Sequence, residues 1–325
     1  MEFTFLGTSA GTPTRARNVT ALALSPTGSK PWYLVDCGEG TQHQLLRANH
    51  SVMQLRAIFI THIHGDHTFG LPGLLTSASM LGRTEPLDII APVQTHRFIA
   101  ATLENSDSSL SYPVNFIDSE AAEFHWQDDC FAVTTVALSH RVPCRAYVFT
   151  ERNLERQLRT DKLTADGIEP GPSWGELQRG QDVTLPDGRL LRSEDYTEIQ
   201  RVARRLIVAG DNDDPTLLTE ACDGSHALIH EATYTQDVAE RVGPWPQHSS
   251  AERVAKFAQK VALPNLVLTH FSSRYQSGSG GSPHINVLAA EALQSFQGQL
   301  FLARDFDTYR LEKDLTLRCL SNEKS

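Results

Sequence analysis

The sequence predicts a mixed α/β fold with two central sheets and helices outside them. Short apolar runs rich in β-branched and aromatic residues predict buried strands, and residues 57–61 are one example. Several of these runs end in a histidine or an aspartate, and a helical segment follows them. No repeat, low-complexity tract or linker divides the chain, so we expect a single domain over residues 1–325.

The expected elements alternate along the chain. In the first half we expect strands near 2–6, 20–25, 32–36, 57–61, 87–91, 114–118, 131–139 and 145–150, and helices over 70–81 and 93–105. In the second half we expect strands at 205–209, 227–230 and 266–269, and helices at about 214–222, 249–261 and 284–296. Ser249 or Ser250 is suited to cap the 249–261 helix, and Pro264 marks its end.

Composition narrows the class of protein. Hydrophobic residues make up 40% of the chain and charged residues 21%, which is ordinary for a globular protein. No apolar run approaches the roughly 20 residues of a membrane span, and no signal peptide is visible. Five scattered cysteines without C-x-x-C spacing fit a reducing cytoplasm, where we expect the protein. The net charge of −10 argues against a non-specific nucleic-acid binder.

A dense group of potential metal ligands follows the strand at 57–61. His62, His64, Asp66 and His67 form the pattern H-x-H-x-D-H around Gly65, which permits a sharp turn. Imidazole and carboxylate together suit zinc or a similar first-row metal. His62 and His64 can face one ion while Asp66 and His67 face a second. The alternative is a surface loop that happens to be rich in histidine.

This pattern resembles the signature of the metallo-β-lactamase superfamily, and its surroundings resemble the short form of the ribonuclease Z family of transfer-RNA 3′-processing nucleases. The similar segments follow the family's order over nearly the whole chain: Phe3 with Leu6-Gly7-Thr8-Ser9, Asp36-Cys37-Gly38-Glu39-Gly40-Thr41-Gln42, Thr61 to His67, Pro170-Gly171-Pro172, His230-Glu231-Ala232-Thr233 and Thr269-His270-Phe271-Ser272-Ser273-Arg274-Tyr275. The resemblance implies a four-layer αβ/βα sandwich with the metals at the edge between the sheets.

The remaining ligands implied by the resemblance each follow an expected strand, as the first motif does. In the family's arrangement His62, His64 and His140 bind one ion, Asp66, His67 and His270 bind the other, and Asp211 bridges them. We therefore expect two Zn²⁺ per subunit, with Mn²⁺ or another divalent ion as the alternative, and no organic cofactor. The family usually has threonine where Asn212 stands, and we expect Thr61 and Asp36 to support the ligands.

The resemblance also implies catalytic roles outside the ligand set. His248 matches the family's catalytic histidine, and Glu231 matches the carboxylate that holds it. A positioned acid of this kind protonates a basic leaving oxygen. Asp66 is expected to accept the proton of the attacking water in addition to binding metal. The alternatives are a surface histidine that caps a helix and a structural carboxylate.

The segment 151–192 is polar and rich in turn residues. In the family an inserted arm at this place grips transfer RNA, and Gly167, Pro170, Gly171 and Pro172 match its marker. A disordered loop is the alternative. Residues 151–180 balance five basic against six acidic groups: Arg152, Arg156, Arg159, Lys162 and Arg179 against Glu151, Glu155, Asp161, Asp166, Glu169 and Glu176. The spacing of Arg152, Arg156 and Arg159 predicts a helix, with either a basic or an amphoteric face.

Arg17 and Asn18 lie in a loop that approaches the metals and the RNA 3′ end in the family, so we expect them to contact substrate; an ordinary loop is the alternative. The expected function is a zinc-dependent phosphodiesterase that removes the 3′ trailer from precursor tRNA and leaves a 3′-hydroxyl. A homodimer is expected from the resemblance.

Three other functions fit parts of the sequence. A hydrolase of small phosphodiesters such as cyclic nucleotides is favoured by the acidic charge and opposed by the arm. An RNA-binding protein without catalysis is opposed by the full ligand set. Hydrolysis of β-lactams or thioesters is opposed by Asp211, Glu231 and His248, which follow the nuclease pattern.

Overall fold

The computed structural model describes residues 1–152, 154–277 and 282–321. They fall into two units, a larger one of Met1–Gln127, Ala132–Thr150 and Arg204–Ser325 and a smaller one of Asp128–Phe131 and Glu151–Ala203. None of the helices in the described residues has the length and apolar character of a membrane span.

The first sheet of the larger unit has eight strands in the order β19-β18-β1-β2-β3-β4-β5-β6. Its strands are β1 (Glu2–Gly7), β2 (Ala21–Ser25), β3 (Trp32–Val35), β4 (Leu55–Phe59), β5 (Leu87–Ala91), β6 (Val114–Asp118), β18 (Thr308–Leu311) and β19 (Leu317–Cys319). β3 to β6 run parallel. A short 3₁₀ helix (Val52–Gln54) leads into β4, and the α-helices of this half are α1 (Thr41–Leu45), α2 (Gly65–Thr68), α3 (Leu71–Met80) and α4 (Val93–Asn105).

The second sheet has seven strands in the order β17-β16-β15-β14-β9-β8-β7. They are β7 (Trp126–Gln127), β8 (Phe131–Leu138), β9 (Cys144–Glu151), β14 (Arg205–Ala209), β15 (Ala227–Glu231), β16 (Asn265–Thr269) and β17 (Gln299–Leu302). β14 to β17 run parallel. The central residues of β14 and every residue of β15 and β16 are buried, which explains why these three strands read as continuous apolar runs. The helices here are a 3₁₀ turn (Pro215–Leu218), α8 (Thr219–Cys222), α9 (Gln236–Val242), α10 (Ala251–Lys260) and α11 (Asn286–Ala292).

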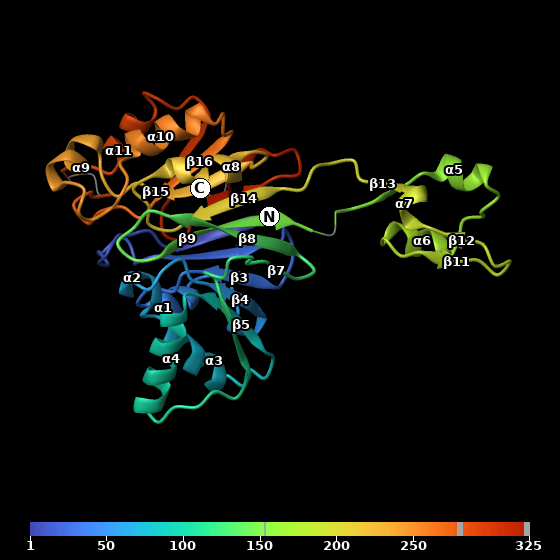
Figure 1. Ribbon diagram of the computed structural model, residues 1–325, viewed down its shortest axis with the longest axis horizontal. Coiled ribbons are helices and arrows are strands. Elements are labelled where there is room, and N and C mark those ends of the chain that lie inside the picture. Colours follow the sequence, from blue (N-terminus) through green and yellow to red (C-terminus); the bar gives the residue numbers. More distant parts are fainter. Residues whose placement is uncertain (153, 278–281, 322–325) are drawn as a thin grey trace. The chain divides into compact units, whose positions relative to one another are not determined.

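Aromatic side chains pack the two sheets against each other. The ring of Phe59 on β4 lies 5.2 Å from that of Tyr147 and 5.1 Å from that of Phe149, both on β9. The Tyr147 hydroxyl donates a 2.7 Å hydrogen bond to the carbonyl of Ile60, which ties the sheets together next to the site. α3 and α4 cover the outer face of the first sheet, and α10 and α11 cover that of the second (Figure 1). The expected αβ/βα sandwich is confirmed.

The expected elements of the larger unit are present, with shifts of a few residues at their ends. Ser250 rather than Ser249 caps α10, because its hydroxyl accepts the Arg253 amide. The expected helix at 214–222 is a 3₁₀ turn followed by the short α8.

The smaller unit has a hydrophobic cluster of its own. Its elements are β10 (Gln157–Leu158), α5 (Thr160–Ala165), α6 (Pro172–Gln178), β11 (Val183–Thr184), β12 (Leu190–Leu191), α7 (Ser193–Tyr196) and β13 (Thr197–Glu198). Leu163, Ile168, Leu177, Val183 and Leu191 pack together at its centre. The unit ends at Ala203, later than the boundary at 192 suggested by the sequence.

The expected helix carrying Arg152, Arg156 and Arg159 is wrong. The described residues between 151 and 159 form no helix, because Gln157 and Leu158 pair with β13 as β10. Arg152 donates to the carbonyl of Asp128, and Arg159 lies 3.8 Å from the Glu198 carboxylate. Arg152 and Arg159 therefore already have partners within the unit.

Replacing Phe59 by alanine tests the packing between the sheets. Phe59 is fully buried, so we expect Phe59→Ala to lower the free energy of unfolding by about 3–5 kcal/mol through loss of apolar contacts and the cavity it leaves. Urea denaturation of the metal-free protein measures this loss. Phe69→Ala is the matched control, because the Phe69 ring is 62% exposed. Equal losses in the two variants would contradict the inter-sheet role of Phe59.

Candidate metal centre

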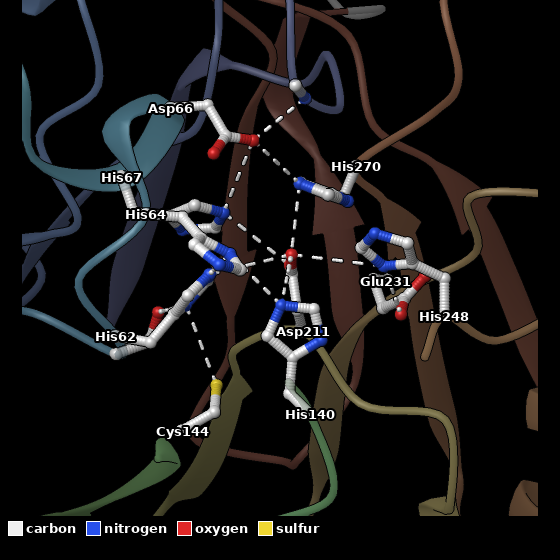
Figure 2. Close-up of polar contacts among 12 residues, drawn as sticks. His62, His64, Asp66, His67, His140, Cys144, Asp211, Glu231, His248 and His270 are labelled. Carbon is white, nitrogen blue, oxygen red and sulfur yellow. Dashed lines mark hydrogen bonds and ion pairs between the residues drawn. The ribbon is translucent and has the colours of Figure 1, made fainter. Parts of the chain in front are cut away.

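Four strand ends converge on one group of histidine and aspartate side chains (Figure 2). β4 of the first sheet is followed by His62 and His64. In the second sheet His140 follows β8, Asp211 follows β14 and His270 follows β16. Residues more than two hundred positions apart therefore meet where the carboxyl ends of the strands lie together.

Asp211 lies at the centre of this group (Figure 2), and its two oxygens contact different imidazoles. Its Oδ2 atom lies 3.6 Å from His62 Nε2 and 3.7 Å from His140 Nε2. His64 completes this first cluster, with its Nδ1 atom 3.1 Å from each of the same two Nε2 atoms.

The other oxygen of Asp211 faces a second cluster. Asp211 Oδ1 lies 3.5 Å from His67 Nε2 and 3.4 Å from His270 Nε2. Asp66 Oδ2 lies 3.6 Å and 3.4 Å from the same two nitrogens. The ligand atoms within each of the two clusters lie within 4.8 Å of one another. The structure thus brings all seven expected ligands together as two sets that share Asp211.

The hydrogen bonds around the imidazoles fit metal binding. Four imidazoles have Nδ1 bonded to an oxygen: His62 to Thr61 Oγ1 (3.0 Å), His67 to Asp36 Oδ2 (2.7 Å), His140 to the Gln247 carbonyl (3.0 Å) and His270 to Thr233 Oγ1 (3.1 Å). The two threonine hydroxyls donate to carboxylates, so they accept here. A proton held on Nδ1 leaves the Nε2 lone pair free for a metal. His67 Nε2 is buried and has no hydrogen-bond partner among the described residues.

The electrostatics also favour a cation. Burial and neighbouring imidazoles lower the pKa of His62 well below its ordinary value, and burial lowers the pKa values of His64 and His140. These imidazoles are therefore neutral and able to act as ligands. Burial acts on His67 too, but three neighbouring carboxylates outweigh it and raise its pKa to about 10. The second cluster thus has excess negative charge that a metal ion would balance.

Asp36 supports the centre from behind. Its carboxylate accepts the Thr61 amide (2.8 Å), the Thr61 hydroxyl (2.9 Å) and His67 Nδ1 (2.7 Å). Asp36 and Thr61 thus contact the expected ligands His67 and His62, and their role in metal binding stays a prediction. Asp36 has a left-handed backbone (φ 60°), which aspartate and asparagine tolerate better than most residues.

Glu231 holds His248 beside the clusters. The buried Glu231 carboxylate accepts His248 Nδ1 (3.0 Å), the Ser249 amide (2.9 Å) and both the amide and hydroxyl of Thr233 (3.1 and 2.6 Å). Burial lowers the pKa of His248, but Glu231, followed by two further carboxylates, outweighs it and raises the pKa to about 9. His248 is thus a held, protonated imidazole at the edge of the site.

Asn212 occupies a position where the family usually has threonine. Its side-chain Nδ2 bonds the buried His230 ring (3.0 Å), and its side-chain Oδ1 accepts the Ser139 backbone amide (3.1 Å). Asn212 therefore links the segments that carry Asp211 and His140.

An open pocket of about 390 Å³ leads to the clusters, and Asp66, Asp211, His248 and His270 are among its lining residues. The Gly11 amide donates to Asp66 Oδ2 (2.7 Å) from the rim of this pocket. A phosphodiester entering it would therefore meet both clusters and His248.

The loop that carries Gly11 is fixed by buried polar contacts. Arg17 is buried, and its guanidinium donates to the Tyr275 carbonyl (2.5 Å) and the Ser277 hydroxyl (2.9 Å), so it is not placed to contact RNA. Asn18 donates its amide N–H to Asp305 Oδ2 (2.6 Å) and its side-chain N–H to the Glu39 carbonyl (2.9 Å). No pattern in the sequence signals these roles of Gly11 and Asp305.

Comparisons with known proteins identify the family. Residues 1–140, less than half of the chain, match a family described as "Anti-Pycsar protein Apyc1". Over 317 residues the chain is 79% identical to ribonuclease Z of Marinobacter nauticus, covering 98% of each protein. The chain belongs to the ribonuclease Z family. It is also 38% identical to ribonuclease BN of Proteus mirabilis, over 96% of this chain and 100% of that protein.

Two solved structures are similar in fold to this ribonuclease Z family member. The human tRNase Z short form superposes with a TM-score of 0.62 at 27% identity, over 95% of this chain and 98% of that one. A metallo-β-lactamase fold protein from Bacillus subtilis gives a TM-score of 0.64 at 16% identity, over 94% and 98%. The latter similarity shows the fold alone.

Asp36→Asn tests the support behind the centre. Asparagine keeps the shape and tolerates the left-handed backbone, but its NH₂ group would face His67 Nδ1–H, forcing the ring to move its proton to Nε2. We expect metal affinity to fall about 10–100-fold. Zinc titration against a chromophoric chelator measures this fall. Asp107→Asn, at an exposed residue that is also left-handed (φ 50°), is the control. Equal affinity in both variants would refute the role of Asp36.

Proposed function

We propose that this protein is a dinuclear-metal endoribonuclease that removes the 3′ trailer from precursor tRNA and leaves a 3′-hydroxyl on the tRNA. The observation that carries the proposal is the shared Asp211, whose two oxygens face two clusters beside the Glu231–His248 pair. Membership of the ribonuclease Z family supports it.

The donor set favours zinc. Five imidazoles and two carboxylates suit Zn²⁺, with Mn²⁺ as the alternative. His62, His64 and His140 would hold one ion, Asp66, His67 and His270 the other, and Asp211 both. Two such ions activate water as a nucleophile and stabilise the charge that gathers on phosphorus oxygens.

The protein's own side chains would handle the protons. Asp66 lies in the pocket wall and would accept the proton of the attacking water, with its Oδ2 oriented by the Gly11 amide. The bond between phosphorus and the ribose 3′ oxygen of the tRNA breaks, and this oxygen needs a proton as it leaves. His248 would donate that proton, because Glu231 fixes Nδ1 and keeps the ring protonated.

The smaller unit is proposed as the arm that binds the body of precursor tRNA. Its marker segment, with Gly167, Pro170, Gly171 and Pro172, is exposed, while the intervening Ile168 is buried in the unit's cluster. An exposed loop anchored by a buried side chain can meet a large ligand without first having to be ordered. We further propose that the protein is cytoplasmic, which agrees with its free cysteines. We also propose that it forms a homodimer.

Replacing residues 152–203 of the smaller unit by a tight turn tests the arm. Thr150 on β9 pairs with Arg205 on β14, so an Asn-Gly turn in place of residues 152–203 would close a two-residue hairpin between Glu151 and Arg204. We expect kcat/KM for precursor tRNA to fall about 100-fold or more, because binding energy remote from the reacting bond is lost. Hydrolysis of bis(p-nitrophenyl) phosphate should be unchanged.

The outcomes of this replacement separate the candidate functions. Loss of both activities with loss of bound metal would mean a damaged core and would call for a longer Gly-Ser linker. Full retention of RNA cleavage would refute the arm. An intact protein that hydrolyses the small ester but not the RNA would favour a phosphodiesterase of small substrates.

Glu231→Gln tests the proton donor. Without the carboxylate charge the pKa of His248 falls, so the alkaline limb of the pH–rate profile for RNA cleavage should move to lower pH. We expect kcat at neutral pH to fall at least about 10-fold. Nitrophenolate leaves without a proton, so hydrolysis of bis(p-nitrophenyl) phosphate should change little. Glu240→Gln, at an exposed glutamate on α9, is the control. An unmoved alkaline limb would remove His248 from the role of acid.

A further inference from the structure

A tryptophan that the metal chemistry does not use stands beside the centre. Trp245 is 72% exposed, the highest value among the exposed aromatic side chains of the described residues. It lies in the segment between α9 and α10 that leads to His248. Most of its surface contacts no other part of the protein, so core packing does not account for it.

The segment that carries Trp245 is rigid. Pro244 and Pro246 flank it, and the Gln247 amide closes a turn on the Pro244 carbonyl (3.1 Å). The Gln247 carbonyl accepts Nδ1 of the metal ligand His140 (3.0 Å). The indole is therefore held at a fixed place relative to the first cluster.

A cation lies over one face of the ring. The guanidinium carbon of Arg141 is 4.5 Å from the centre of the Trp245 ring. Arg141 is exposed and has no carboxylate partner within 4 Å among the described residues. Arg141 and His64 line both the pocket over the metal clusters and an adjoining open groove of about 740 Å³ that includes Trp245. The groove thus continues from the site of phosphodiester cleavage.

We propose that Trp245 and Arg141 form a subsite for one nucleotide next to the scissile phosphate, with the base stacked on the indole face that Arg141 does not cover and a flanking phosphate paired with the guanidinium. This rests on the proposed function, because it places an RNA strand across the centre. A rigid aromatic face and an unpaired arginine are the groups that bind single-stranded nucleic acid without reading its sequence. The subsite also supplies local positive charge in a protein of net charge −10.

The test pairs variants of the protein with abasic substrates. Precursor tRNAs that lack one base are prepared, with the abasic position moved along the nucleotides on either side of the cleavage site. Cleavage of the intact precursor by the unaltered protein establishes the proposed function first. Trp245→Ala should then lower kcat/KM for the intact precursor about 10-fold to 100-fold.

The decisive measurement is whether the losses caused by Trp245→Ala and by a missing base add up or not. For one abasic position the unaltered protein should lose a similar factor, and Trp245→Ala should cause no further loss there. Trp245→Phe should recover most of the activity. Arg141→Gln should lower the slope of log(kcat/KM) against log salt by about 0.7, as expected for one lost phosphate contact on a single strand. Leu293→Ala, at another exposed apolar residue, is the control.

Three results would overturn the subsite. An unchanged kcat/KM in Trp245→Ala would show that the base does not touch the ring. An equal loss on every abasic substrate would assign Trp245 a structural role through His140 or His248. A change in sedimentation without coupling to any base would place Trp245 in a contact between two copies of the chain.

Discussion

The sharing of Asp211 between two clusters is the constraint on which the site depends. For one carboxylate to face two clusters, the ends of β4, β8, β14 and β16 must meet within a few ångströms. That requirement fixes how the two sheets pack. The rings of Phe59 and Tyr147 set the sheet separation, and the Tyr147 hydroxyl bonds a carbonyl only two residues before His62. The packing of the two sheets therefore determines the geometry of the ligands.

Three of the seven non-glycine residues with positive φ in the described part of the chain lie at this junction. Left-handed conformations occur at Asp36, which supports His67, at Gln247, whose carbonyl orients His140, and at His270 itself. Each such residue costs about 1–3 kcal/mol and persists only where the surroundings enforce it. The core of the sandwich offsets this strain. The hydrogen bonds that orient the imidazoles therefore depend on the folding of the whole larger unit.

The fold could be predicted because its signals are local or repeated, while the positions of the distant candidate ligands were implied by the family resemblance. Buried strands are short apolar runs, and the ligands follow them directly, as His270 follows β16. The support from Gly11 and Asp305 could not be predicted, since it depends on contacts between distant parts of the chain: the Gly11 amide meets Asp66, and Asp305 meets the Asn18 amide. The arginine spacing at 152–159 misled because spacing alone does not exclude a strand, and β10 pairs with β13 there. Arg17 was misplaced for a related reason: its charge suggested a surface role, but the side chain is buried against main-chain carbonyls.

The register of β9 and β14 has a consequence for how such an enzyme changes over time. Thr150 and Arg205 are neighbours across the sheet, so everything between them is one long hairpin loop. The entropy of closing a loop grows only logarithmically with its length, by about 0.6 kcal/mol per doubling. A domain inserted at this place can lengthen, shrink or be exchanged at little thermodynamic cost to the sandwich. Substrate range and bond-breaking chemistry can therefore diverge independently within a single chain.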